Sequence, residues 1–482
     1  MSIDPASRLT PRHIALVATA LCVASLALFW PGTAMYDAVA QYKQVLSGVY
    51  DDWHPPAMAR IWALLAPLGA GATPMLVLQL GTYWLGLGLI AAALARAGRS
   101  RSAVAIIVIG LLPPFLGWQG VVLKDAQLTG AMLGACGLVG WYRLSHRPMP
   151  RALWVPTALL LAYAVLVRAN AVFIVVPLVV TLAPRPAGTV AKIITGLIAV
   201  VVVLAVAPVV NHQILRAQRS GVESTQALFD LAGIAARVPD GTAIGLTRAE
   251  ADAVVARHCA SPFFWDPLGD DAHCGTTMAR LRALPVGTLY LTLAGSALHH
   301  PIAYAAHRFA HLNSTDRWLV PFHWPSAAPP TMSEPNTVGL ASPNAAARHW
   351  ESLTAMIVET PLGWPISWIV IAITALATGL SRPADPAPDP AHDPVRDLAT
   401  ALLVSALALE ASFAVLSIAS DLRYHLWPMI ATAVAVVLLA DRAPPRHIAR
   451  AGIVVLLLVL ASGGAARVLS PPPPQTYAGM LG

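Results

Sequence analysis

Charged side chains are scarce in this chain. Asp, Glu, Lys and Arg make up 11% of its 482 residues, whereas apolar residues make up 57%. A soluble globular protein carries about 25% charged residues, so the composition excludes an ordinary soluble domain and indicates an integral membrane protein. The net charge of +7 does not indicate nucleic-acid binding, because the basic residues lie in short loops between apolar runs.

The sequence also lacks the motifs of nucleotide binding. It contains no Walker A loop, no GxGxxG between a strand and a helix, and no DxD motif for a nucleotide sugar and its metal. We therefore expect no nucleotide cofactor, and a transferred group should arrive from the lipid phase. Whether a divalent cation is used stays open.

Cysteine is rare as well. Cys22 and Cys136 lie in apolar runs, where we expect inert core side chains. Cys259 and Cys274 lie in a polar insert, and in an oxidising compartment a disulfide between them is favoured over two free thiols.

Long apolar runs dominate what is present. A run must cross a hydrocarbon core of about 30 Å, and the candidates lie near 13–30, 74–95, 103–120, 122–141, 192–210, 364–380, 398–418, 427–440 and 451–468. A cleaved signal peptide is the alternative for the first run, but its length suits a full span better.

The region 152–183 needs separate treatment. As one helix it would be about 48 Å long, and Arg168 and Asn170 interrupt it midway. We divide it into two short spans that meet at the membrane surface, which gives about eleven transmembrane helices.

Loop charge supports this topology with the N-terminus in the cytoplasm. Of the 31 Lys and Arg residues, 15 fall in the segments that it places inside, as the positive-inside rule expects. These segments are 1–12, 96–102, 142–151, 184–192, 381–397 and 441–450.

Three parts follow from this arrangement. We expect residues 1–210 to form an N-terminal transmembrane module, the candidate catalytic part, whose first outer loop is 31–73. Residues 211–363 form an extracytoplasmic insert of helices and irregular chain. Residues 364–482 add the C-terminal transmembrane helices and a cytoplasmic linker, 381–397, that is rich in proline and aspartate.

Two patterns in the insert predict helices. Thr247 and Glu250 have the spacing of a capping box at the start of a helix over 247–259. His300, His307 and His311 share one face of a second helix. We expect that face to rest on lipid headgroups rather than to bind a metal.

Acidic residues lie near the outer ends of the predicted spans. Ionisable groups at membrane depth cost about 2.5–3.5 kcal/mol on insertion scales, so Asp37 and Asp125 require a cavity, a partner or a task. Asp37 could instead cap a short helix, and Asp125 could pair with a neighbouring cation. Asp51 and Asp52 either belong to the same site or form a solvated turn.

Basic residues lie near the same surface, and a cluster of them would suit a lipid phosphate, since Arg gives bidentate contacts and Lys a point charge. The candidates are Lys43, Arg60, Lys124, Arg168 and Arg423. Each alone could extend its charged head to the interface instead.

His54 precedes two prolines at the entrance to a helix, where a structural cap and a ligand role are both open. Position in an aromatic belt explains Tyr424 and Trp427.

Three elements resemble the GT-C superfamily of polytopic glycosyltransferases, in the branch with family 39 and the lipid A aminoarabinose transferase-like enzymes. The residues that carry this resemblance are Asp37 through His54-Pro55-Pro56, Asp125 in VLKDAQLTG, and Arg423, Tyr424 and Pro428, with Arg168 and Pro177 between them. It implies an all-α, GT-C-like membrane bundle in the bacterial cytoplasmic membrane, with its active site on the extracytoplasmic face.

The resemblance also implies inverting transfer of a sugar from a polyprenyl-phosphate donor to a glycan, lipid or protein acceptor. It makes Asp37 the general base and Asp125 a helper or metal ligand, and His54 would orient Asp37 or contact the sugar. The substrate-binding residues would be Lys124, Arg168, Arg423, Tyr424 and Asp52.

Two other functions stay open. A transporter or flippase for a lipid-linked glycan would use the same cations without a base, and an O-antigen polymerase or ligase would also have a large outer loop. Transporters usually hold their ionisable residues near the bilayer midplane, whereas here they fall at the outer rim, which favours chemistry at the surface.

Overall fold

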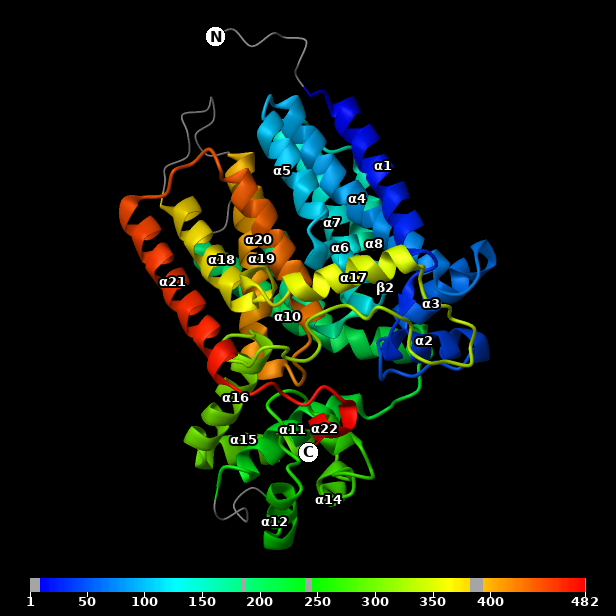
Figure 1. Ribbon diagram of the computed structural model, residues 1–482, viewed down its shortest axis with the longest axis vertical. Coiled ribbons are helices and arrows are strands. Elements are labelled where there is room, and N and C mark those ends of the chain that lie inside the picture. Colours follow the sequence, from blue (N-terminus) through cyan, green and yellow to red (C-terminus); the bar gives the residue numbers. More distant parts are fainter. Residues whose placement is uncertain (1–8, 184–187, 239–244, 382–392, 482) are drawn as a thin grey trace.

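The computed structural model describes residues 9–183, 188–238, 245–381 and 393–481, and helices account for most of them. The apolar helices are α1 (Pro11–Phe29), α4 (Thr73–Arg96), α5 (Ser100–Gly110), α6 (Pro113–Gly120), α7 (Lys124–Leu144), α8 (Arg151–Val167), α9 (Val172–Leu182), α10 (Thr189–Val209), α18 (Pro365–Leu380), α19 (Pro394–Leu416), α20 (Leu426–Leu438) and α21 (Arg446–Leu469). In Figure 1, many of these run roughly alongside one another, with the helices of 225–315 gathered at one end, whereas the later insert helix α17 (Ala345–Ile357) lies against α6 and α1.

Five helices of the described chain are long and apolar enough to cross a membrane: α1, α4, α10 with its continuation to Ile214, α19 and α21. A sixth span results if α5 and α6, which are bent by 49° at their junction, count as one. The chain is therefore a mostly helical, multi-pass membrane protein. Every predicted apolar run forms a helix or a helix pair, but the count of eleven spans stays a prediction.

The helix over 152–183 is interrupted where the sequence indicated. Helix α8 ends at Val167, Arg168 is extended with φ −152° and ψ 117°, and α9 begins after the short 3-10 helix η3 (Ala169–Ala171). Helix α8 packs against α7, whereas α9 packs against α19. The break therefore separates two helices with different neighbours.

Helices α4 and α7 are in close contact because both present glycine to the other. A Cβ atom at Gly86 would clash with the backbone carbonyl of Leu133, and one at Gly137 would clash with Gly86. Small residues of this kind let membrane helices approach closely. This packing holds α7, whose first turn carries Lys124 and Asp125, in a fixed position.

The remaining elements belong to the loops and the insert. The helices are α2 (Tyr36–Ser47), α3 (Ala57–Leu65), α11 (Thr225–Ala235), α12 (Arg248–Ala256), α13 (Asp266–Gly269), α14 (Ala279–Arg282), α15 (Val286–His299), α16 (Pro301–Thr315), α17 (Ala345–Ile357) and α22 (Tyr477–Leu481). The two short strands are β1 (Thr33–Ala34) and β2 (Val121–Val122), which pair in parallel.

The insert has a buried apolar cluster of its own, formed by residues of α11, α15 and the chain around 246–281. Cys259 and Cys274 lie in this cluster and are joined by a disulfide. The predicted capping box at the start of α12 is confirmed, since the Thr247 hydroxyl accepts a hydrogen bond from the amide of Glu250 and the Glu250 carboxylate accepts one from the amide of Thr247.

The predicted lipid-facing histidine surface is wrong. His307 and His311 are only 1% and 0% exposed, because α16 packs between α11 and α19. His307 Nε2 lies 3.2 Å from Asp230 Oδ1, and His311 Nδ1 lies 2.8 Å from the carbonyl oxygen of Pro262. These side chains are polar members of a packed interface.

Two other sequence expectations need comment. Most of the predicted linker 381–397 lies outside the described residues. The aromatic-belt interpretation of Trp427 is wrong, since its ring is buried and its indole nitrogen donates to Ser405 Oγ at 2.9 Å.

Candidate functional site

A two-residue strand pair brings the segment after α1 to the start of α7. Thr33 pairs with Val121 and Ala34 with Val122. Asp37 follows β1 in the first turn of α2, and Lys124 and Asp125 follow β2 in the first turn of α7. Because parallel strands point the same way, both first turns emerge on the same side of the strand pair.

Asp37 lies among basic side chains from three parts of the chain. Its Oδ2 is 3.4 Å from Lys124 Nζ and 3.4 Å from Arg423 Nη2, and its Oδ1 is 3.8 Å from His54 Nε2. Burial alone would raise the pKa of Asp37, but Arg423, Lys124 and His54 outweigh burial and hold this pKa well below its usual range. Asp37 is therefore ionised at neutral pH.

His54 is neutral and has a defined orientation. Burial lowers the pKa of His54 to about 4, and the charge of Lys124 acts in the same direction. Lys124 Nζ lies 3.0 Å from His54 Nδ1, so Nδ1 accepts and the ring proton is on Nε2. That N–H is on the side of the ring that faces Asp37.

Asp125 is shared by two arginines. Its side chain is 2% exposed, Oδ1 pairs with Arg168 Nη1, and Oδ2 lies 3.8 Å from Arg423 Nε. Asn170 Oδ1 accepts a hydrogen bond of 2.8 Å from Arg168 Nε. The break between α8 and α9 thus supplies both the arginine and the amide that orients it.

Arg423 connects the two carboxylates Asp37 and Asp125. It belongs to the short 3-10 helix η8 (Leu422–His425), which precedes α20. The Tyr424 ring stacks against both guanidinium groups, with centroid distances of 4.0 Å to Arg168 and 5.5 Å to Arg423. These six residues (Asp37, His54, Lys124, Asp125, Arg168 and Arg423), together with Tyr424, form one cluster, which we name the outer-rim cluster after the position that the sequence predicts for it.

Three predicted or considered residues lie elsewhere. Asp52 Oδ1 accepts hydrogen bonds of 2.7 Å from the amide and hydroxyl of Ser220, and Oδ2 lies 3.4 Å from His212 Nε2. Arg60 donates to the carbonyl of Leu215, and Lys43 is exposed. Asp52 and Arg60 therefore connect the loop between α2 and α4 to the segment after α10 and are not members of the outer-rim cluster.

Sequence reasoning missed two acids at this site. Asp421 Oδ2 pairs with Arg423 Nη2 at 3.1 Å, and its position two residues before the arginine was a usable signal. Asp266, in α13 of the insert, lies near enough to be influenced by Asp421 and Asp37. Burial and the charge of Asp421 raise the pKa of Asp266 to about 6. Nothing in the sequence connects the insert with the first loop.

The chemical capacity of the outer-rim cluster follows from its charges. Lys124, Arg168 and Arg423 are cations that keep 15%, 13% and 7% of their side chains exposed, and Asp37 keeps 13%. Asp37 is thus a reachable carboxylate beside donors that suit a phosphate. Such a site can accept a proton and stabilise an anion within a few ångströms.

Comparisons with known proteins add no evidence about this site. No protein family model matches the sequence, and no curated protein does. Among solved structures, the crystal structure of ArnT from Cupriavidus metallidurans bound to undecaprenyl phosphate aligns with 88% of this chain and 76% of that chain. The identity is 13% and the TM-score 0.29. This likeness is distant and carries no argument about function.

Proposed function

We propose that this chain transfers a sugar from a polyprenyl-phosphate donor to an acceptor, with inversion, at the extracytoplasmic face of the bacterial cytoplasmic membrane. The supporting observation is the position of Asp37, a partly exposed carboxylate 3.4 Å from both an ammonium and a guanidinium group. In this proposal the membrane module has about eleven spans, and the acceptor approaches from the side of the insert, 211–363.

The cations are the proposed donor site. Lys124 and Arg423 contact the lipid phosphate, and Arg168 supports it from the side of Tyr424. A phosphate needs several donors in a poorly hydrated place, because an unpaired charge there is costly. Arg423 then exchanges part of its interaction with Asp37 for one with the donor.

Asp37 is the proposed general base. It takes the proton of the acceptor hydroxyl while the hydroxyl oxygen attacks the anomeric carbon from the face opposite the phosphate. The bond from sugar to phosphate oxygen breaks, and the electron pair leaves with the polyprenyl phosphate, whose charge the cations stabilise. A single carboxylate suffices, since phosphate needs no general acid to depart.

Donor binding would also activate this base. Lys124 and Arg423 keep the pKa of Asp37 low in the free protein, so Asp37 alone is a weak base. A bound phosphate offsets those positive charges and raises the pKa of Asp37. Proton abstraction therefore becomes effective only when the donor is in place.

The other residues of the cluster position these groups. Asp125 is buried between two arginines, so we assign it the task of orienting Arg168 and Arg423. His54 directs its N–H toward Asp37. Asp52 acts indirectly, by holding the loop that carries His54 to Ser220.

Replacement of Asp37 with Asn tests this proposal and separates it from transport. The full chain in proteoliposomes is assayed for sugar transfer from a panel of undecaprenyl-phosphate sugars, and for binding of undecaprenyl phosphate. We expect Asp37→Asn to lose at least about 100-fold in transfer rate, in the range that general-base catalysis supplies, and to retain lipid binding. Asp252→Asn, at an exposed position of α12, is the matched control and should behave as wild type.

Wild-type transfer rates in Asp37→Asn would refute the proposal. So would a wild-type protein that moves a lipid-linked glycan across the bilayer without forming a glycoside, because that result identifies a transporter.

A further inference from the structure

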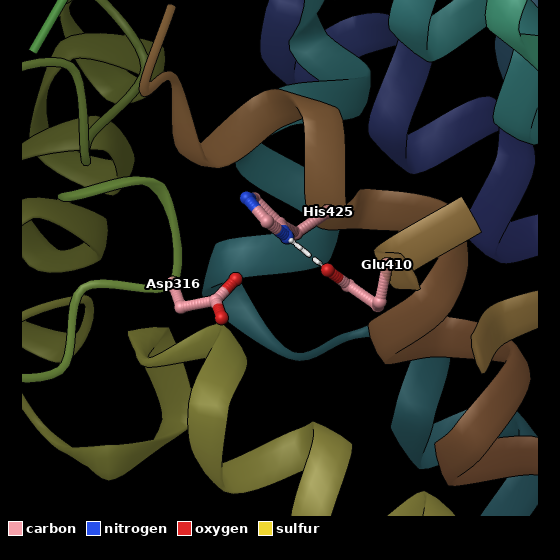
Figure 2. A group of neighbouring side chains, drawn as sticks. All are labelled: Asp316, Glu410 and His425. Carbon is pink, nitrogen blue, oxygen red and sulfur yellow. Dashed lines mark hydrogen bonds and ion pairs between the residues drawn. The ribbon is translucent and has the colours of Figure 1, made fainter. Parts of the chain in front are cut away.

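A second buried cluster lies behind the outer-rim cluster. Asp316 follows the last residue of α16, Glu410 lies in α19, and His425 ends η8. One ligand atom from each lies within 4.8 Å of the other two, and Figure 2 shows the three side chains directed into one common space. The residues are 6%, 5% and 0% exposed.

The carboxyl groups of this cluster have no lysine or arginine partner in the part of the chain that the structure describes. Among the described residues, His425 is the only basic side chain within pairing distance of Glu410, and no lysine or arginine pairs with Asp316. Asp316 Oδ1 is buried without a hydrogen-bond partner. Arg317 is adjacent in sequence but donates to the carbonyls of Trp324 and Pro325. Ionising both of these buried carboxyl groups is costly unless a cation binds between them.

His425 has the hydrogen-bonding arrangement of a metal ligand. Its Nδ1 faces Glu410 Oε2 at 2.9 Å, and its Nε2 lies 3.1 Å from Thr315 Oγ1. Metal-bound imidazoles usually donate their second N–H to a fixed partner, which sets the tautomer. Thr315 is 0% exposed and can accept that proton, leaving Nδ1 free to bind a metal.

We propose that Asp316, Glu410 and His425 bind one divalent transition-metal ion, of which Zn²⁺ fits best. One imidazole and two carboxylates are ligands that Zn²⁺ accepts, and a tetrahedral site with three protein ligands completes its shell with water. The imidazole disfavours Mg²⁺ and Ca²⁺, which prefer oxygen ligands. The ion neutralises the two buried carboxylates.

The metal ties three parts of the chain together. Asp316 belongs to the insert, Glu410 to a membrane helix, and His425 to the same short helix as Arg423. Metal binding at His425 therefore restrains η8 and keeps Arg423, in the same short helix, beside Asp37. The site uses residues outside the outer-rim cluster, so it does not depend on the proposed function.

Metal titration of the full chain in detergent micelles tests the site. The protein is stripped with a chelator and then titrated with Zn²⁺ or Mg²⁺ against a chromophoric competitor. We expect one equivalent of Zn²⁺ per chain and no competition from Mg²⁺. Loss of the residue that holds a metal-binding imidazole by a hydrogen bond usually costs about 10- to 100-fold in affinity, so Thr315→Val should show a loss of this size. Asp316→Asn and His425→Gln should lose more.

One control variant and one spectroscopic measurement on the wild-type protein complete the test. His323→Gln removes an exposed histidine that lies 3.8 Å from Glu359 and should leave Zn²⁺ affinity unchanged. X-ray absorption of the wild-type complex, which needs no variant to fold, should show one imidazole with oxygen ligands and no sulfur. Folded wild-type protein that takes up no Zn²⁺, equal affinity in Asp316→Asn, or a spectrum with several imidazoles would each overturn the proposal.

Discussion

Replacing Asp125 with asparagine removes the carboxylate with which Arg168 pairs in the described chain. Arg168 keeps the amide of Asn170 and the face of Tyr424 but loses its counter-charge. Arg423 is affected less, because Asp37 and Asp421 remain within 3.4 Å and 3.1 Å of its Nη2. One half-buried cation is therefore left without a counter-charge.

The expected cost follows from this asymmetry. Breaking a buried ion pair by removing one partner costs about 3–5 kcal/mol. Because only one of the two arginines is left unpaired, we expect Asp125→Asn to lower the free energy of unfolding by about 3 kcal/mol, the lower end of that range. Asp421→Asn should cost less, because Arg423 keeps both Asp37 and Asp125 as counter-charges.

A double-mutant cycle provides the assay. Wild type, Asp125→Asn, Arg168→Gln and the double variant are unfolded by denaturant in mixed micelles, with helix content followed by circular dichroism. Contacting residues of one network couple by about 0.5–3 kcal/mol. The double variant should therefore lose less free energy of unfolding than the two single variants lose together. Strict additivity, or an Asp125→Asn protein as stable as wild type, would refute the reasoning.

Two further changes test other parts of the chain. The pKa of His54 is lowered to about 4, so its contribution to stability is complete above its ordinary pKa and is lost as the pH falls. Wild type should lose about 2.5 kcal/mol more than His54→Asn between about pH 7.5 and about pH 4.5 in unfolding assays, and equal losses would contradict this pKa. Cys259→Ser with Cys274→Ser opens a loop of 15 residues, which should cost the insert about 3 kcal/mol. Protease resistance of the insert reports this loss, and resistance equal to that of wild type would contradict it.

Much of the outer-rim cluster can be anticipated from the sequence because membrane depth restricts where charge is tolerated. Asp37, Asp125, Arg168 and Arg423 each lie near an end or a break of an apolar run, where an ionisable group is costly without a partner. The structure brings these four side chains together. Their roles in transfer remain the proposal made above.

Other parts depend on packing between distant segments. Asp52 lies in the predicted loop, yet Ser220 holds it away from the outer-rim cluster. The histidine face of α16 has the spacing of a surface stripe, and only its contact with α11 and α19 reveals that it is buried. Glu410 gave a local signal, a lone acid within an apolar run, but its partners Asp316 and His425 are unpredictable from spacing.

The strand pair β1–β2 has a consequence for chain length. Only two residues separate Ala34 from Asp37, and α2 begins between them. One residue inserted there would rotate the first turn of α2 by about 100° and move the Asp37 carboxylate away from Lys124 and Arg423. An insertion in the loop after α2 would leave this turn in place. We therefore expect proteins that use this arrangement to share a fixed interval between strand and acid, while the length of the intervening outer loop varies freely.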